Sequence, residues 1–525
     1  MFRLLTLALV LSVSVAGVVP NPVTDGDRGE YVTLSVPENT SLGGYTLSDG
    51  ETTVSLPNVT VSGRVALAAD TALARNLTDA RVVRVPGFPR LANGGETLVL
   101  RRNGTVVDRV TYADAPEGEV FINGEWRPLG ATDVRTASGT DVDVSAFTLP
   151  DAPERVRAAL RGADDRVLLA GYTFSSPRVA RLLAAAADRG ATVRVLVEGG
   201  PVGGVTDASA RVLDRLVASE VAVRVLNGPR ARYAYHHAKY AVADDRALVT
   251  SENWKPGGVG GHATRGWGVV LRDRGLADHL AAVHAADSTW RDGIPWREYR
   301  ANATFQDGAP ATDTYRSDFD AWNGTAEASV FVTPDDGHQT TLSVLRNATD
   351  RLLVQQVRID DDRFLNATLD AARRGVHTRV LLGGAWYVRE ENRKLVDRLR
   401  KTARAEGLPL RARVVDPRSR FDHLHVKGVV TENAVLVGSL NWNHESVENN
   451  REVMVALRGR AVADYYADVF RADWRGGVWR LPLVALAGTL LVVLAAGGVL
   501  WRRVSFSGSG RSGVPRRVPR PPSSR

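Results

Sequence analysis

The chain lacks cysteine altogether, which excludes disulfide bridges, thiolate zinc sites, iron–sulfur clusters and a cysteine nucleophile. Lysine is also scarce, because all but five of the 67 basic residues are arginine. Net positive charge is missing from most of the length: the net charge is +8, and residues 502–525 alone contain seven arginines and no acid, which leaves the other residues near +1. The nearly neutral remainder offers little electrostatic attraction to nucleic acid.

The overall composition is that of a folded protein. Hydrophobic residues make up 44% of the 525 residues and charged residues 24%, which excludes a disordered chain. Glycine and proline show no collagen-like period. At roughly 150 residues per domain, the length predicts about three folded units.

The two ends of the chain predict a protein of the cell membrane. Residues 1–16 combine a basic start, an apolar run and small residues, which is typical of a secretory signal peptide. Residues 481–500 carry no charge and are long enough for one transmembrane helix. The arginine-rich residues 501–525 predict a disordered cytoplasmic tail. We therefore expect a single-pass protein with its ectodomain outside.

The expected ectodomain also contains glycosylation motifs. Eight Asn-x-Ser/Thr sequons lie between the predicted signal and the predicted span, at Asn39, Asn58, Asn76, Asn103, Asn302, Asn323, Asn347 and Asn366. They favour a glycoprotein whose large middle part faces outward.

Residues 28–115 predict a small β-sandwich. Short β segments alternate there with turn residues, and Asn103-Gly104 predicts a hairpin. The sequence of the segments 44–49, 91–100 and 104–112 resembles that of the lamin-tail domain, an immunoglobulin-like module. That resemblance implies a binding or spacing role without catalytic residues. The glycine- and aspartate-rich residues 116–146 are expected to form a linker.

The remaining ectodomain contains an internal repeat. Residues 183–196 match residues 369–382, because each segment is a helical pattern closed by Arg-Gly and followed by a strand. Alternating strands and helices predict an α/β fold in two similar halves, residues 147–300 and 327–475. We expect α/β/α sandwich halves packed about a pseudo-twofold axis, because a site shared between the halves needs both.

Each half carries a His-x-Lys motif followed by an acidic residue and a Ser-x-Asn motif. The first half has His237, Lys239, Asp244, Ser251 and Asn253, and the second has His425, Lys427, Glu432, Ser439 and Asn441. These motifs resemble the pattern of the phospholipase D superfamily, His-x-Lys-x4-Asp followed by Gly-Ser-x-Asn in each half. The resemblance covers about residues 147–475.

The motif spacing explains why these residue types belong together. On a strand, alternate side chains share a face, so each histidine projects beside its lysine. This places a nucleophile or proton carrier next to a fixed positive charge, as a phosphodiester anion requires. The resemblance implies that one histidine attacks phosphorus and the other protonates the leaving oxygen, through a phosphohistidine intermediate. Phosphate binding is expected from Lys239, Lys427, Ser251, Asn253, Ser439 and Asn441, and structural roles from Asp244 and Glu432.

The two halves differ at one acidic position. Glu452 aligns with Gly266 of the first half. In the superfamily, an acidic residue at this place orients a catalytic histidine, commonly the one in the opposite half. The resemblance thus implies that Glu452 orients His237, which becomes the nucleophile. His425 is then expected to serve as general acid and base without a carboxylate partner.

These residues predict an outward-facing phosphodiesterase that hydrolyses or transfers phosphatidyl groups. The expected substrate is a phospholipid or another phosphodiester, and the membrane is the expected partner. No cofactor or metal is expected, because neither His236-His237 nor His423-x-His425 has a third ligand at metal-binding spacing. The sequence does not predict the oligomeric state.

Two alternative functions remain open. An endonuclease with the same site would use nucleic acid as its substrate and would need a basic track, for which the sequence offers Arg230, Arg232, Arg418 and Arg420. A catalytically degenerate surface binding protein would explain Thr250 in place of the motif glycine, Gly266, and Glu432 in place of aspartate.

Several aromatic residues lie close to the motifs in sequence. Trp254 and Trp442 directly follow the motif asparagines, and we interpret them as core residues rather than pocket wall. Contact with substrate is open for aromatics that follow strands expected to end near the site, namely Tyr172, Phe174, Trp386 and Tyr387.

Overall fold

The computed structural model describes residues 12–476, except 133, 227–231, 291, 309 and 418, together with residue 496. Residues 1–477 form one compact unit, and the predicted span 481–500 and tail 501–525 fall in a second unit that lies outside the described residues apart from 496. Within the described part of the chain, no helix combines the length and the apolar character needed to cross a membrane.

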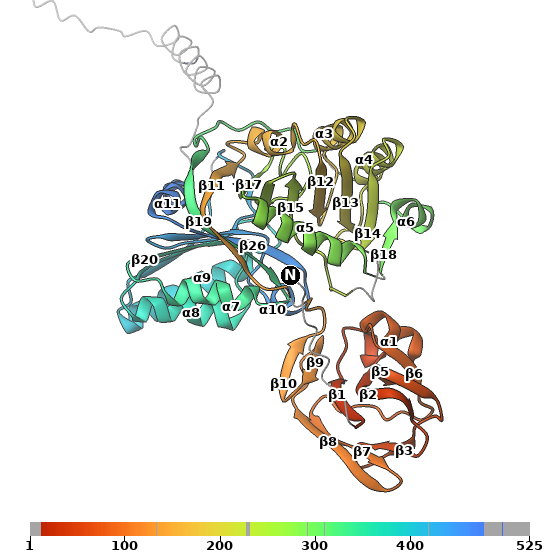
Figure 1. Ribbon diagram of the computed structural model, residues 1–525. Coiled ribbons are helices and arrows are strands. Elements are labelled where there is room, and N and C mark those ends of the chain that lie inside the picture. The colour runs from red at the N-terminus through yellow and green to blue at the C-terminus, as the bar shows by residue number, and fades with distance from the viewer. Residues whose placement is uncertain are drawn as a thin grey trace, which may run out of the picture. The chain divides into compact units, whose positions relative to one another are not determined.

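The N-terminal part contains two β-sheets that share one hydrophobic core (Figure 1). The first sheet has the order β10 (Glu125–Pro128), β9 (Glu119–Ile122), β1 (Ser14–Val19), β2 (Tyr31–Ser41), β5 (Thr60–Ala68) and β6 (Arg81–Arg84). The second has the order β4 (Thr53–Ser55), β3 (Tyr45–Ser48), β7 (Gly95–Arg102) and β8 (Thr105–Ala113). A 3-10 turn, η1 (Asp25–Asp27), and α1 (Thr71–Leu77) complete this part.

The predicted hairpin is confirmed. Arg102 of β7 pairs with Thr105 of β8, and the two residues between them have φ angles of 47° for Asn103 and 85° for Gly104. Asparagine and glycine adopt this left-handed backbone more readily than other residues, so the pair fixes the register of the hairpin. The relation of this domain to lamin-tail or immunoglobulin-like modules stays a prediction.

The expected boundaries of the sandwich, residues 28–115, were wrong. Strand β1 pairs with β2 and β9, and Val18 is fully buried in the shared core. Strands β9 and β10 lie in the expected linker 116–146, and they belong to the same sheet. A signal-peptide cut after Ala16 would divide β1, so that boundary does not fit the fold either.

The rest of the compact unit is built around one sixteen-stranded sheet, which consists of two similar halves (Figure 1). Half 1 has the strand order β18 (Gly293–Pro295), β14 (Ala222–Leu226), β13 (Thr192–Glu198), β12 (Arg166–Gly171), β15 (Tyr240–Ala243), β16 (Arg246–Thr250), β17 (Thr264–Arg272) and β11 (Ala137–Leu149). Half 2 continues with β19 (Trp322–Thr333), β26 (Glu452–Arg458), β25 (Ala434–Gly438), β24 (Lys427–Val430), β20 (Arg351–Gln356), β21 (His377–Leu382) and β22 (Leu410–Val414). The short β23 (His423–Leu424) pairs with β17 across the halves.

The predicted duplication is therefore confirmed, with each half beginning earlier than expected. The N-terminal strands β11 and β19 start at residues 137 and 322, ahead of the predicted 147 and 327. These two strands pair with each other and join the half-sheets. The strand orders on either side of this junction correspond one to one from β17 and β26 outward to β14 and β22.

Helices cover both faces of the half-sheets: one helix of each half packs into the core shared between the halves, and the others pack on the outer faces. Half 1 has α2 (Glu154–Leu160), α3 (Pro177–Asp188), α4 (Asp207–Ala218), α5 (Arg274–Ser288) and α6 (Trp296–Asn302). Half 2 has α7 (Gly337–Arg346), α8 (Asp362–Arg373), α9 (Arg389–Glu406), α10 (His444–Glu448) and α11 (Arg460–Arg475). The repeated Arg-Gly pairs end α3 and α8 as predicted, with φ angles of 97° at Gly190 and 91° at Gly375.

A shared core holds the two halves together. Strands β16 and β17 contact β25 and β26, and buried side chains from all four strands belong to one cluster. Its largest member is Trp267, which is fully buried and packs on Tyr466 with 4.7 Å between ring centroids. Gly428 leaves room for this indole, because a Cβ there would lie 2.3 Å from the Cζ3 atom of Trp267.

We predict that Gly428→Ala destabilises the contact between the halves. The added methyl would overlap a fully buried indole, and overpacking of this kind costs about 1 to 3 kcal/mol. The matched control is Gly94→Ala, whose added Cβ has no atom within 4 Å. Urea unfolding of both variants measures the difference. Equal stability of the two variants would contradict the packing described for Trp267.

Candidate active site

The two motif histidines are held by backbone pairing with the opposite half. The main-chain N–H of His237 donates to the carbonyl of Arg451, which directly precedes β26, at 2.9 Å. The N–H of His425 donates in the same way to the carbonyl of Arg265 in β17, also at 2.9 Å. Each histidine therefore lies beside the strand position that follows the accepting carbonyl, which is Glu452 in one case and Gly266 in the other.

Glu452 contacts His237 as the sequence predicts. Both carboxylate oxygens lie 2.9 Å from Nδ1 of His237, so this interaction leaves Nε2 of the ring available. Glu452 is fully buried, and burial raises its pKa to about 7, although Lys239 and the Ser439 hydroxyl act in the opposite direction. Burial and the two lysines Lys239 and Lys427 lower the pKa of His237 well below its usual value.

The expectation that His425 lacks a carboxylate was wrong. Nδ1 of His425 lies 3.5 Å from Oε2 of Glu252, which is 1% exposed. Glu252 is the variable residue between Ser251 and Asn253, and no carboxylate was expected for His425 because the position equivalent to Glu452 is occupied by Gly266. The sequence did contain a signal: the first Ser-x-Asn motif has the ionisable Glu252 at the position where the second motif has Leu440.

Both motif lysines are buried at the same site. The Nζ group of Lys239 donates to the carbonyl of His237, and that of Lys427 donates to the carbonyl of His425 at 2.9 Å. Burial lowers the pKa of Lys239 well below its usual value, and it lowers the pKa of Lys427 to about 8. Glu252 and Glu452 both counteract these shifts, so the charges of the two halves act on one another.

The hydroxyl groups of the two motif serines are hydrogen-bonded to the backbone. The Ser251 hydroxyl accepts from the N–H of Trp267, and the Ser439 hydroxyl accepts from the N–H of Val453, both at 3.1 Å. The two hydroxyls thus anchor their loops to β17 and β26, which does not support the phosphate-binding role expected for them. Asn253 is buried, and its Oδ1 atom has no hydrogen-bond partner among the described residues. Asn441 is half-buried.

The acidic residues of the two motifs have the same structural function. Asp244 accepts from the backbone N–H groups of residues 164, 165 and 166, at 3.0 to 3.1 Å. Glu432 accepts from the N–H and hydroxyl of Thr349 and from the N–H groups of residues 350 and 351. Each carboxylate holds the start of the first core strand of its half, β12 or β20. Replacing aspartate by glutamate at 432 preserves this arrangement.

Tyr172 is the aromatic residue in closest contact with the histidines. Its ring lies edge-on to His237, with 4.7 Å between centroids, and the Nζ of Lys239 lies 5.3 Å from its centroid. Trp254 and Trp442 are core residues, as predicted, and Phe174 also lies in the core. Trp386 and Tyr387 are 87% and 49% exposed and stay candidates for substrate contact.

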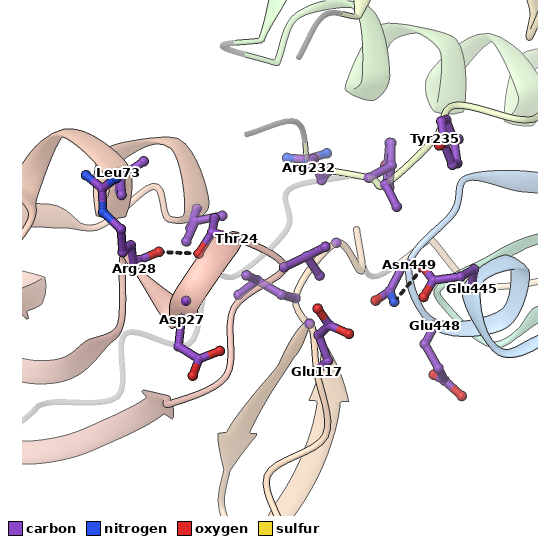
Figure 2. Close-up of a pocket in the computed structure, with 18 residues that line it drawn as sticks. Thr24, Asp27, Arg28, Leu73, Glu117, Arg232, Tyr235, Glu445, Glu448 and Asn449 are labelled. Carbon is purple, nitrogen blue, oxygen red and sulfur yellow. Dashed lines mark hydrogen bonds between the residues drawn. The ribbon is translucent and has the colours of Figure 1, made fainter. Parts of the chain in front are cut away.

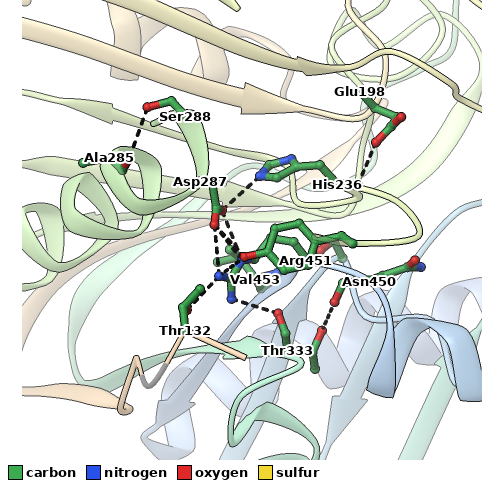
Figure 3. A network of polar contacts seen from close by, with 12 residues as sticks. Thr132, Glu198, His236, Ala285, Asp287, Ser288, Thr333, Asn450, Arg451 and Val453 are labelled. Carbon is green, nitrogen blue, oxygen red and sulfur yellow. Dashed lines mark hydrogen bonds and ion pairs between the residues drawn. The ribbon is translucent and has the colours of Figure 1, made fainter. Parts of the chain in front are cut away.

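A buried polar network surrounds Arg451, whose carbonyl accepts from the N–H of His237 (Figure 3). The guanidinium contacts Asp287 of α5 at 3.0 Å and Asp335 at 2.8 Å, and Asp287 also bonds Nε2 of His236 at 3.1 Å. Arg451 belongs to half 2 and Asp287 to half 1, so the ion pair ties the halves together directly beside Glu452. The strong positive charge lowers the pKa of Asp287 despite its burial.

An equivalent arginine lies beside His425. Arg265 is 1% exposed and pairs with Asp473 of α11 at 3.1 Å and with Asp151 of its own half. The two arginines whose carbonyls hold the histidine segments are therefore each fixed by a helix of the opposite half, α5 for Arg451 and α11 for Arg265. This explains how the site geometry is maintained by groups that do not face a substrate.

A cavity of about 760 Å³ lies outside this cluster (Figure 2). Its lining contains neither motif histidine, neither motif lysine, and neither Glu252 nor Glu452. Tyr235 connects the cavity to the site, because its ring packs against Tyr172. Among the described residues, the site included, no group of three or more histidine, aspartate or glutamate side chains is arranged to hold a metal ion.

Solved structures that match this chain have low sequence identity to it and TM-scores below 0.5. Phosphatidylserine synthase from Haemophilus influenzae Rd KW20 is 13% identical with a TM-score of 0.46, over 63% of this chain and 87% of that one. Nuc, a phospholipase D family member from Salmonella typhimurium, is 18% identical with a TM-score of 0.26, over 31% and 98%. Polyphosphate kinase from Porphyromonas gingivalis is 14% identical with a TM-score of 0.39, over 62% and 50%.

Comparison with family models gives a more definite result. None of the curated proteins matches the chain. The family model described as "Cardiolipin synthase, PLD-like domain" matches residues 156–287 and 341–474. These segments of 132 and 134 residues make up just over half of the 525 residues, and one lies in each half of the sheet. The chain therefore belongs to this phospholipase D-like family.

Proposed function

We propose that this protein is a phosphodiesterase of the phospholipase D type that hydrolyses or transfers phosphatidyl groups. The observation that carries the proposal is the reciprocal pairing of the two histidines. His237 contacts Glu452 and His425 contacts Glu252, so each imidazole has a carboxylate from the opposite half. Membership of the phospholipase D-like family supports the same reaction class.

The geometry supports a two-step displacement. Nδ1 of His237 is held by Glu452, so Nε2 attacks phosphorus, and a phosphorus–nitrogen bond forms as the bond to the leaving oxygen breaks. His425 donates a proton to that oxygen. In the second step, His425 takes a proton from water or an alcohol, whose oxygen attacks phosphorus and releases His237. The products are a phosphatidic acid or a new phosphodiester.

We assign the nucleophile to His237 because its carboxylate contact is the tighter one. Glu452 places both oxygens 2.9 Å from Nδ1, whereas Glu252 places one oxygen 3.5 Å from Nδ1 of His425. A rigidly held ring is suited to in-line attack. The more loosely held ring is suited to moving a proton between two different oxygen atoms. Lys239 and Lys427 supply positive charge for the phosphoryl oxygens.

Lipid is favoured over nucleic acid as the substrate. The basic track that an endonuclease would need loses two of its members, because Arg420 pairs with Asp473 at 2.7 Å and Arg232 stacks on Trp290. Arg230 and Arg418 lie outside the described residues. The chain is nearly neutral apart from its C-terminal arginines, which also argues against a nucleic-acid substrate. The sequence-predicted span would keep the protein close to lipid, with the site facing outward.

The degenerate-binding-protein alternative loses its motivation. Glu432 makes the same turn contacts as Asp244, and Gly266 lies beside a carboxylate supplied by Glu252. Glu432 of half 2 and Gly266 of half 1 therefore have structural explanations that are compatible with a carboxylate contact for each histidine.

We predict that the purified protein releases the head group from phospholipid vesicles in the presence of EDTA, and that His237→Ala abolishes release. Vesicles of defined phosphatidylglycerol, phosphatidylethanolamine or phosphatidylcholine should be compared with labelled single- and double-stranded DNA. A quench that spares acid-labile bonds should trap phosphate on His237. Cleavage of DNA alone would favour the endonuclease, and loss of all turnover on chelation would contradict the mechanism.

Glu452→Gln should change both turnover and the pH dependence of stability. Burial raises the pKa of Glu452 to about 7 from an ordinary 4.5, so the folded protein retains a proton that the unfolded chain releases in this window. Stability of the parent protein therefore falls as pH rises from about 4.5 to about 7, and the glutamine variant lacks this contribution. We expect the variant to gain stability relative to the parent across that range and to lose turnover by at least about a hundredfold.

Urea unfolding at several pH values and initial rates with a lipid substrate would test this prediction. A stability difference that does not change between pH 4.5 and 7 would contradict the raised pKa of the buried Glu452 carboxyl. A turnover effect below about threefold would remove Glu452 from the catalytic group.

A further inference from the structure

Three residues that distinguish half 1 from half 2 lie in direct contact. At equivalent positions, half 1 has Thr250, Glu252 and Gly266, and half 2 has Gly438, Leu440 and Glu452. A Cβ on Gly266 would lie 2.2 Å from Cγ and 2.5 Å from Oε1 of Glu252. The side chain of Glu252 thus occupies the space that a side chain at position 266 would fill.

Position 266 is the place from which a carboxylate would reach His425. Glu452 follows the carbonyl of Arg451, which binds the N–H of His237, and Gly266 follows the carbonyl of Arg265, which binds the N–H of His425. The two backbone arrangements are equivalent. A carboxylate at position 266 would therefore contact the imidazole of His425, which is the ring that Glu252 contacts.

We propose that Glu252 is the positioning carboxylate of His425, moved from the strand position 266 to the motif loop, with Thr250 and Gly266 as the substitutions that accommodate it. Half 1 thereby keeps a carboxylate for the histidine of the opposite half. The catalytic part of this inference rests on the proposed function, whereas the structural part concerns the imidazole alone.

The contacts of Glu252 support this assignment. Oε2 lies 3.5 Å from Nδ1 of His425 and accepts a hydrogen bond of 2.7 Å from the Thr264 hydroxyl. Burial raises the pKa of Glu252, but His425, Thr264 and the charge of Lys427 outweigh that effect, so the pKa is lowered. The side chain is an ionised group within the lysine-rich site. It lies beside the histidine without a direct place in the attack on phosphorus.

Thr250 contributes to the same arrangement. Its hydroxyl donates to the carbonyl of Trp267 at 3.1 Å and accepts from the N–H of Glu252 at 3.2 Å. It therefore fixes the backbone from which Glu252 projects. The equivalent Gly438 of half 2 has no room for a side chain, because a Cβ there would lie 2.3 Å from the carbonyl oxygen of Val453.

The chain itself provides the design of the test. Glu252→Leu removes the carboxylate, and the double variant Glu252→Leu with Gly266→Glu gives half 1 the residues of half 2 at both positions. We expect Glu252→Leu and Glu252→Gln to lower kcat by at least about a hundredfold, with KM little changed. The double variant should recover at least about tenfold over Glu252→Leu. The control is Glu390→Gln, a side chain that is 80% exposed.

A second measurement separates positioning from folding. Nitrogen-15 NMR of histidine-labelled protein reports the protonation of His425 Nδ1, with His425→Gln used to assign the signal. The parent should show Nδ1 protonated, Glu252→Leu should lose this preference, and the double variant should regain it. Melting temperatures identify any variant that is merely unfolded, and Glu252→Gln, which nearly keeps the shape, maintains the test if Glu252→Leu does not fold.

The possible outcomes distinguish this inference from the proposed function. If His237→Ala is inactive but Glu252→Gln stays within threefold of the parent with an unchanged pH profile, the inference is overturned and the function stands. If the parent turns over neither phospholipid nor DNA, the proposed function fails, and the NMR signal of His425 decides the inference. Recovery in the double variant supports it, and a signal independent of Glu252 overturns it.

Discussion

The structure depends on an exchange between two similar halves. The segment that carries each histidine is hydrogen-bonded to a strand of the opposite half, and its carboxylate partner also comes from there. Buried arginines secure the same strands, since Arg451 pairs with Asp287 and Arg265 with Asp473. Such buried pairs are costly to break, because one partner is then left as an unpaired charge. The same contacts therefore hold the two halves together and align the histidines with their carboxylates.

Burial disfavours the charged forms of the lysines at the site, and the two glutamates partly offset this effect. Four ionisable groups from the two motifs, His237, Lys239, His425 and Lys427, share a small volume with two glutamates. Burial lowers the pKa of the histidines and lysines, while the carboxylates favour the protonated lysines. A phosphodiester anion adds negative charge to this cluster, so substrate binding is expected to relieve the repulsion among the cations.

Local patterns predicted the parts of the fold that local physics determines. The Asn103-Gly104 hairpin and the Arg-Gly helix ends follow from backbone preferences of single residues, and the duplication was visible as repeated spacing. The Glu452 contact followed from family resemblance. The acid at position 252 was visible in the sequence, but its contact with His425 was not, because that contact arises only when segments distant in sequence lie side by side. Strand β1 was missed because an apolar N-terminal segment resembles a signal peptide in composition.

The clash between position 266 and Glu252 has a consequence for how such a duplicated protein changes over time. With a carboxylate at both places, two acids would compete for one small space, and with neither, the opposite imidazole would have no partner. A passage from one arrangement to the other therefore runs through a crowded or an impaired intermediate. Half 1 and half 2 show the two arrangements within a single polypeptide, with the acid at position 252 in half 1 and at position 452 in half 2.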